Sequence, residues 1–192
     1  MKSVFIGLCL FIYATAGIAA PQRFTLDQSH TTVAFLIDHI GYAKTLGQFT
    51  DVSGSFDFDQ DTGQVANITI SVNTASVQTH HEGRDKHVRN KDFLNVKKFP
   101  KMEFNAASAL IDESGKGVVE GELNLLGQVQ PLMLDVQLNK ADNYPFGHKK
   151  LTLGISARGE LMRSAYGMDY GVANALVGDA VALIIEIEAI QE

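Results

Sequence analysis

Histidines with suggestive spacing are the first candidates for chemistry in this sequence. His80, His81 and His87 fall in one polar stretch, and His80 and His87 are seven residues apart, near one face of a helix. Imidazole is a common zinc ligand, but helical zinc ligands usually stand four residues apart with a carboxylate nearby. His30 and His39 are nine apart on one predicted strand, so their side chains should point to opposite faces. We therefore expect surface or capping histidines and no metal.

A second candidate is the run Arg84-Asp85-Lys86-His87, which contains groups that general acid–base catalysis uses. Such catalysis needs groups that converge on a substrate, and no Gly-x-Ser-x-Gly nucleophile motif accompanies this run. We instead expect Arg84 and Asp85 to form ion pairs and hydrogen bonds that hold a helix against the fold. The sequence thus predicts no catalytic residue and no cofactor.

The N-terminal residues predict export. Lys2 supplies a positive charge, an apolar run follows, and small residues fill positions 14–20, as in a cleavable signal peptide. The apolar run is shorter than the roughly 20 residues that a membrane-spanning helix needs. We expect cleavage after Ala19, which gives a signal peptide at 1–19, a mature single domain at 20–192, and a periplasmic location.

Composition narrows the function classes further. The chain has 192 residues, of which 45% are hydrophobic and 20% charged, values typical of one globular domain. Its only cysteine, Cys9, lies in the predicted signal peptide, so the mature chain should have no disulfide and no thiolate chemistry. Sixteen basic against 22 acidic residues give a net charge of −6. Without a clustered Lys/Arg run, such a chain is a poor candidate for binding nucleic acid or an anionic membrane surface.

The elements that must position any site are strands, because apolar and polar residues alternate along much of the chain. Eight segments show this pattern. They span residues 32–37, 53–59, 67–73, 102–106, 119–125, 132–139, 151–158 and 181–188.

Two longer stretches interrupt the alternation. Residues 79–96 suit a helix or two that cap one end of the fold, and residues 162–178 suit a long loop before the last strand. Tight turns are expected at 59–63, at 112–117 and at Gly127-Gln128. Eight antiparallel strands could pair as a sandwich or close into a barrel, which removes the sheet edges and can hold one small ligand. Alternation alone favours neither the sandwich nor the barrel.

From Phe24 to Glu188 the chain resembles the YceI-like family of secreted, polyisoprenoid-binding proteins of bacteria. The motifs are weak singly, but they occur in the family's order and spacing. Thr31, Val88 and Ala165-Tyr166 depart mildly from the family's usual residues. The matching elements are Asp27-Gln28-Ser29-His30, the strand from Val33 to His39, Gly47-Gln48-Phe49, Arg84-Asp85-Lys86-His87, Asp92-Phe93, Phe99-Pro100, Gly121-Glu122-Leu123 through Gly127, Arg163, Tyr166-Gly167-Met168 and Val177-Gly178-Asp179.

The resemblance implies a mainly β fold, an eight-stranded antiparallel lipocalin-like barrel with a flanking helix. It also implies an exported carrier, not an enzyme, that holds a polyisoprenoid, an isoprenoid quinone or a fatty-acid-derived lipid in the barrel interior. Family members often pair as dimers, so a homodimer is an option here. The alternative is a secreted hydrolase or isomerase that acts on such lipids, which the missing nucleophile motif disfavours.

The predicted ligand-binding residues are those on the apolar rows. Small residues on these rows, including Gly121 and Ala157, suggest that the interior is not filled by side chains, although strand glycines can instead mark bulges. Gly121 in particular should face the cavity beside Leu123. The full set is Val33, Phe35, Ile37, Phe56, Ile68, Ile70, Phe104, Gly121, Leu123, Leu134, Leu153, Ile155, Met168, Leu183 and Ile185.

Overall fold

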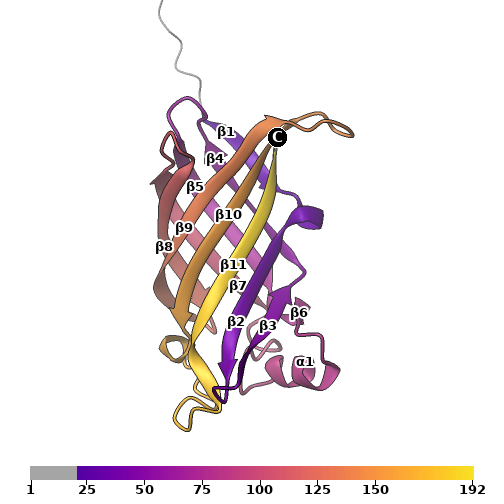
Figure 1. Cartoon of the computed structure of the whole chain (residues 1–192), viewed down its shortest axis with the longest axis vertical. Helices are drawn as coiled ribbons and strands as arrows, with labels where there is room; N and C mark the ends of the chain where they lie inside the picture. Colours follow the sequence, from indigo (N-terminus) through magenta and orange to yellow (C-terminus); the bar gives the residue numbers. More distant parts are fainter. Residues whose placement is uncertain (1–20) are drawn as a thin grey trace, which may run out of the picture.

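The computed structural model describes residues 21–192 and shows a β-barrel with one short α-helix at one end (Figure 1). The predicted signal peptide at 1–19 lies outside the described residues. None of the described helices is long and apolar enough to span a membrane. The strands are β1 (Gln22–Leu26), β2 (Thr32–His39), β3 (Ala43–Phe49), β4 (Val52–Phe58), β5 (Gln64–Asn73), β6 (Val77–Gln78), β7 (Lys101–Leu110), β8 (Lys116–Leu125), β9 (Gln128–Asn143), β10 (Leu151–Met162) and β11 (Val177–Gln191). The helices are α1 (Glu82–Val88) and the 3-10 helices η1 (Gln28–His30), η2 (Thr74–Ser76) and η3 (Arg163–Tyr166).

The barrel closes through hydrogen bonding between its first and last strands. The sheet order is β1-β4-β5-β7-β8-β9-β10-β11, and β11 pairs back onto β1, with Phe24 opposite Gln191. Every pairing is antiparallel, so no free edge remains in this ring. The predicted eight-stranded antiparallel barrel with a flanking helix is confirmed.

Three of the eight barrel positions are each occupied by a strand broken in two. β1 and β2 both pair with β11, on either side of η1. β3 and β4 follow each other along the next position, and β5 and β6 along the third, with η2 between them. The strands β1, β3 and β6 were not predicted, because they are short or carry too many polar residues to alternate clearly.

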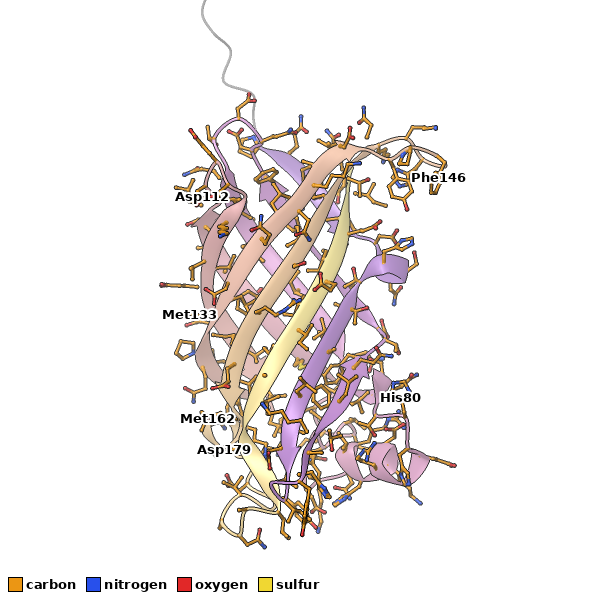
Figure 2. All side chains as sticks on the ribbon, in the orientation of Figure 1. His80, Asp112, Met133, Phe146, Met162 and Asp179 are labelled. Atoms are coloured by element: carbon orange, nitrogen blue, oxygen red, sulfur yellow. The ribbon has the colours of Figure 1, made fainter. Side chains whose placement is uncertain are left out.

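The two ends of the barrel differ. One end carries the turns that follow β4 and β7, the β9–β10 loop with Phe146, and the C-terminus (Figures 1 and 2). The other carries the β2–β3 turn, α1 and the segment that joins it to β7, the β8–β9 turn and the long β10–β11 loop. The β8–β9 turn uses Leu126 and Gly127, one residue earlier than predicted, and both have the positive φ (55° and 74°) that a type I′ turn requires.

Aromatic packing fills the barrel at the C-terminal end. Phe24 of β1 is 1% exposed and stacks on Phe56, with ring centroids 5.9 Å apart. Its edge also meets Phe58, 6.3 Å away. Leu153 and Ala189 are buried in the same core. We call this the closed end, and the end that carries α1 the open end.

Candidate functional site

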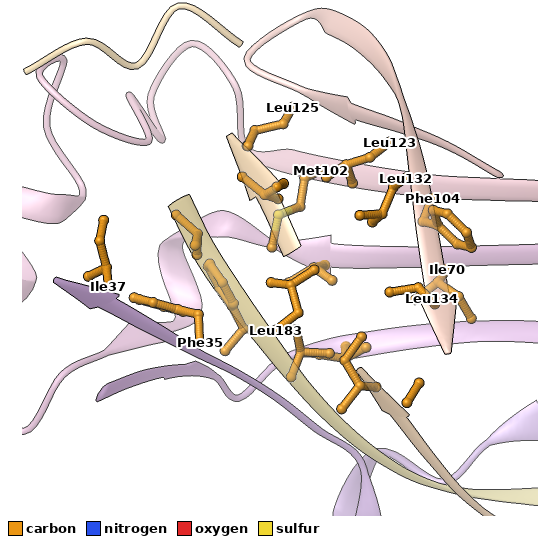
Figure 3. Close-up of a pocket in the computed structure, with 18 of the residues that line it drawn as sticks. Phe35, Ile37, Ile70, Met102, Phe104, Leu123, Leu125, Leu132, Leu134 and Leu183 are labelled. Atoms are coloured by element: carbon orange, nitrogen blue, oxygen red, sulfur yellow. The ribbon is translucent and has the colours of Figure 1, made fainter. Parts of the chain in front are cut away.

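The barrel encloses a cavity of about 500 Å³ whose lining extends from Phe56 and Phe58 to the residues of the open end. Figure 3 shows part of this lining. Pockets of roughly 300–1,000 Å³ are typical of small-molecule sites. On β11 the lining runs from Val177 to Ile187, a span of about 33 Å at ~3.3 Å per residue. With the ~40° tilt usual for barrel strands, the cavity is about 25 Å long along the barrel axis. It is a long, narrow slot.

Almost all of its wall is aliphatic or aromatic. All the residues predicted from the apolar rows lie on this wall except Gly121, and Figure 3 shows Phe35, Ile70, Phe104 and Leu134 among them. Sixteen further wall residues of the barrel strands and their turns were not predicted, although some continue the same alternating rows. These are Phe49, Val52, Phe58, Val65, Val72, Met102, Ile111, Val119, Leu125, Leu132, Val136, Leu138, Ala157, Leu161, Val181 and Ile187.

The prediction for Gly121 was wrong. Gly121 stands on the apolar row of β8 between Val119 and Leu123, but the Phe104 ring of β7 covers it and separates it from the cavity. A Cβ at Gly121 would lie 2.5 Å from Phe104 Cζ and 2.6 Å from the Asn105 carbonyl oxygen. The glycine therefore makes room indirectly, because the missing Cβ lets the tip of the Phe104 ring approach the β8 backbone.

Gly121→Ala should consequently destabilise the barrel by about 1–3 kcal/mol, the usual range for overpacking a core. The control is Gly154→Ala on β10, where an added Cβ meets nothing within 4 Å and should change the free energy of unfolding by less than about 1 kcal/mol. Urea unfolding of both variants measures the difference. Equal stabilities would show that the Phe104 ring shifts freely.

Polar side chains line the cavity only at the open end. They are Asp38, His39, Thr45, Thr79, Arg84 and His87. Beside them Ile40, Tyr170 and Leu176 line the cavity while 41–45% exposed, so the cavity meets solvent here. The site is thus an apolar shaft with a polar mouth.

The segment that carries α1 is tied to the barrel at Thr79, directly after β6. Thr79 is 2% exposed, and its N–H and hydroxyl both donate to Asp85 Oδ1 at 2.6 Å. These bonds lower the pKa of Asp85 below its ordinary value. Arg84 Nε donates to the Thr79 hydroxyl at 2.8 Å. The hydrogen bonds expected of Arg84 and Asp85 are therefore present, but neither residue forms an ion pair within the described part of the chain. His81 caps α1 by accepting the Arg84 N–H.

Aromatic contacts join α1 and its following segment to the β10–β11 loop, the two stretches that interrupt the strand pattern. His87 meets the rings of Phe93 and Tyr170, each with centroids 5.0 Å away, and Phe93 lies 5.2 Å from Tyr170. His87 Nε2 also lies 3.1 Å from Asp92 Oδ2. All three rings line the mouth. His87 therefore has a packing role there, while His80 is exposed.

A buried arginine organises the β10–β11 loop. Arg163 is 1% exposed, and burial lowers the pKa of its guanidinium, which nevertheless remains charged. It donates to four backbone carbonyls, two in the loop and two in the first residues of β11, at distances of 2.5–2.9 Å. The acceptors are the carbonyl oxygens of Met168, Tyr170, Val177 and Gly178. Because one planar group satisfies all four, the loop has a fixed shape at the mouth.

A separate polar cluster lies outside the cavity, where β1 and β2 are interrupted. Asp27, His30 and Glu188 have donor atoms within 4.8 Å of one another, and no other described group of three meets that criterion for a metal. His30 Nδ1 lies 2.8 Å from Asp27 Oδ2 and 3.7 Å from Glu188 Oε2. We interpret the cluster as an ion pair that fastens η1 to β11. His30 thus lies in η1, not on the predicted strand.

This pair makes a pH-dependent contribution to stability. The hydrogen bond to Asp27, and then the Glu188 charge, raise the pKa of His30 above its ordinary 6.5. The His30 bond lowers the pKa of Asp27 below 3.8. The His30 contribution is full below pH 6.5 and is lost as the pH rises through the raised pKa. The Asp27 contribution is full above pH 3.8 and is lost as the pH falls through its lowered pKa.

His30→Asn should therefore lower the free energy of unfolding most between pH 3.8 and pH 6.5, where both contributions are full. It should have little effect above the raised His30 pKa. NMR titration of His30 in Asp27→Asn should show its pKa moving back toward 6.5. A His30 pKa that is the same with and without Asp27 would contradict the assigned pair.

Known proteins share both the sequence pattern and the barrel architecture of this chain. Residues 24–189 match the model of the YceI-like domain family. The chain is 32% identical over 197 residues to Protein YceI of Escherichia coli O17:K52:H18, with full coverage of both. The crystal structure of the Campylobacter jejuni YceI protein covers 81% of this chain and 89% of its own, with a TM-score of 0.72 and 26% identity.

A more distant structure shares the fold. It is a polyisoprenoid binding domain from Saccharophagus degradans, with a TM-score of 0.59 and 13% identity, which covers 88% of this chain and 98% of its own. The family match spans nearly all of the described barrel, and the curated relative aligns over its whole length. The chain belongs to the YceI-like domain family.

Proposed function

We propose that this protein is an exported carrier that holds a polyisoprenoid, an isoprenoid quinone or another long-chain amphiphilic lipid inside the barrel. The observation that carries the proposal is the apolar slot of about 500 Å³, which is open at one end and closed at the other by Phe24, Phe56 and Phe58. Its length of about 25 Å suits an extended hydrocarbon chain.

The distribution of polarity supports an amphiphile. A chain in the shaft would meet only apolar side chains, and its polar group would lie among Asp38, His39, Arg84 and His87 at the mouth. Burial of a five-carbon unit contributes about 4 kcal/mol before binding costs are subtracted, at ~0.8 kcal/mol per carbon. Several units would therefore outweigh the ordering cost. The ligand class named for the Saccharophagus neighbour agrees with this reading.

The predicted signal peptide supports export to the periplasm, and the bacterial origin of the curated relatives agrees with it. The hydrolase or isomerase alternative receives no support from the cavity. Of the described residues that line it, none is serine or cysteine. Thr79 is engaged by Asp85 and Arg84, which leaves its hydroxyl without a free base.

Native mass spectrometry of protein purified from the periplasm tests the proposal. We expect a non-covalent adduct with the mass of one long-chain lipid, released on denaturation, and an N-terminus at Ala20. A protein that carries no lipid, and that takes up none when refolded with a polyprenol, would overturn the carrier function. Retention of Met1 in the exported protein would overturn the cleavage.

A further inference from the structure

The open end of the barrel concentrates positive charge that the net charge of the chain conceals. Residues 82–101 carry seven of the 16 basic residues and three of the 22 acidic ones, a net charge of +4. The remainder of the chain therefore carries −10. The cluster escaped the sequence analysis because its basic residues are spaced apart and do not form a run.

Five lysines of this segment face solvent and form no ion pair among the described residues. They are Lys86, Lys91, Lys97, Lys98 and Lys101. Arg84 and Arg89 are instead engaged with carbonyl groups near β6. Two of the three acidic groups are engaged as well, Asp85 by Thr79 and Asp92 by His87. The free charge of this segment is thus mainly ammonium, and its five lysines outnumber the carboxylates of Asp38 and Asp169 at the same end.

Exposed apolar side chains surround the mouth at the same end. Tyr42, at the tip of the β2–β3 turn, is 90% exposed, and Ile40 of the same turn is 45% exposed. The Ile40 N–H donates to the Leu176 carbonyl, which joins this turn to the exposed Leu176 of the β10–β11 loop. Tyr170 completes the group, which we call the apolar rim: Ile40, Tyr42, Tyr170 and Leu176.

A rim of apolar and tyrosine side chains beside lysines is the combination that binds the interface of an anionic bilayer. The apolar groups enter the headgroup region, and ammonium groups bind anionic headgroups. We propose that the open end docks on a membrane surface that contains anionic phospholipid, with the cavity mouth facing the bilayer. The docking proposal is argued only from the charge of the lysines and the exposure of the apolar rim. The use of this surface to load or release a lipid rests on the proposed function.

Vesicle flotation tests the docking. The probes are vesicles of phosphatidylcholine alone and of an equal mixture of phosphatidylcholine and phosphatidylglycerol, both free of polyprenols. We expect binding to the mixed vesicles that weakens as salt screens the charges. Because each lysine near an anionic surface changes partitioning about fivefold, Lys91→Gln, Lys97→Gln and Lys98→Gln together should reduce it by roughly 100-fold.

The matched control lies at the closed end. Lys116→Gln, Lys149→Gln and Lys150→Gln together change the net charge equally, and we expect partitioning within about twofold of the wild type. Tyr42→Ser should also weaken binding, whereas Phe146→Ser at the closed end should not (Figure 2). Equal loss from both lysine sets, or no binding of wild type to either vesicle, would overturn the proposal. Native mass spectrometry of the same variants reports the bound lipid, so failure to dock and failure to carry are distinguished.

Discussion

Replacing Ala157 with phenylalanine is expected to empty the barrel of lipid without unfolding it. Ala157 of β10 lies between Val136 of β9 and Ile185 of β11, and all three line the shaft. A phenyl ring here would occupy space that the ligand chain needs. Loss of one five-carbon unit forfeits about 4 kcal/mol of gross burial energy, and 1.4 kcal/mol already changes affinity tenfold. We therefore expect lipid co-purification to fall at least about tenfold.

The matched control is Ala182→Phe on β11. Ala182 lies on the outward row, opposite Leu36 and Glu160, and does not line the cavity. Lipid content by mass spectrometry and folding by circular dichroism should be unchanged in this variant. Equal lipid content in the two variants would show that the ligand does not occupy the shaft.

Removal of the Arg163 guanidinium should produce the largest loss of stability. Arg163→Met leaves four carbonyl groups, two in the β10–β11 loop and two at the start of β11, without their donor, and we expect the free energy of unfolding to fall by about 3–5 kcal/mol. Arg163→Lys should recover little, because one ammonium cannot reproduce the planar, forked geometry. Hydrogen exchange in residues 164–178 should accelerate in both variants.

Arg158→Met is the control for this change. Arg158 lies on β10, shortly before Arg163 of η3, but its side chain is 51% exposed, and it pairs with Glu186 on the barrel surface. Exposed pairs of this kind contribute about 0–1 kcal/mol. Urea unfolding that gave the same loss for Arg158→Met and Arg163→Met would contradict the organising role of Arg163.

Most of the barrel could be predicted because alternation reports directly on burial. Residues 181–188 carry large apolar side chains at every second position, and among them the odd-numbered side chains line the cavity while Ile184 and Glu186 do not. β3 escaped because Lys44, Thr45 and Gly47 dilute its pattern. Alternation describes the residues of one strand only. It therefore cannot predict whether a side chain of the neighbouring strand covers a given residue.

That limit explains the errors at the site. Gly121 was assigned to the cavity from its own row, but its exposure depends on the Phe104 ring of the adjacent strand. The role of Arg163 depends on carbonyl groups as far along the chain as Gly178, and no side-chain pattern encodes their position. His30 was assigned to a strand together with His39, although the alternation begins only at residue 32 and Asp27, the N-cap of η1, was visible in the sequence.

The most direct test of the central claim is a measurement of contacts between ligand and methyl groups. Methyl-labelled protein would be refolded with a polyprenol, and intermolecular nuclear Overhauser effects would be recorded. If the barrel interior is the binding site, the ligand shows contacts to Leu134, Leu183 and Ile185 on the cavity wall, and none to Leu36 and Ile184, which lie outside it. Contacts confined to Leu36 and Ile184, or none to any cavity methyl, would contradict the account.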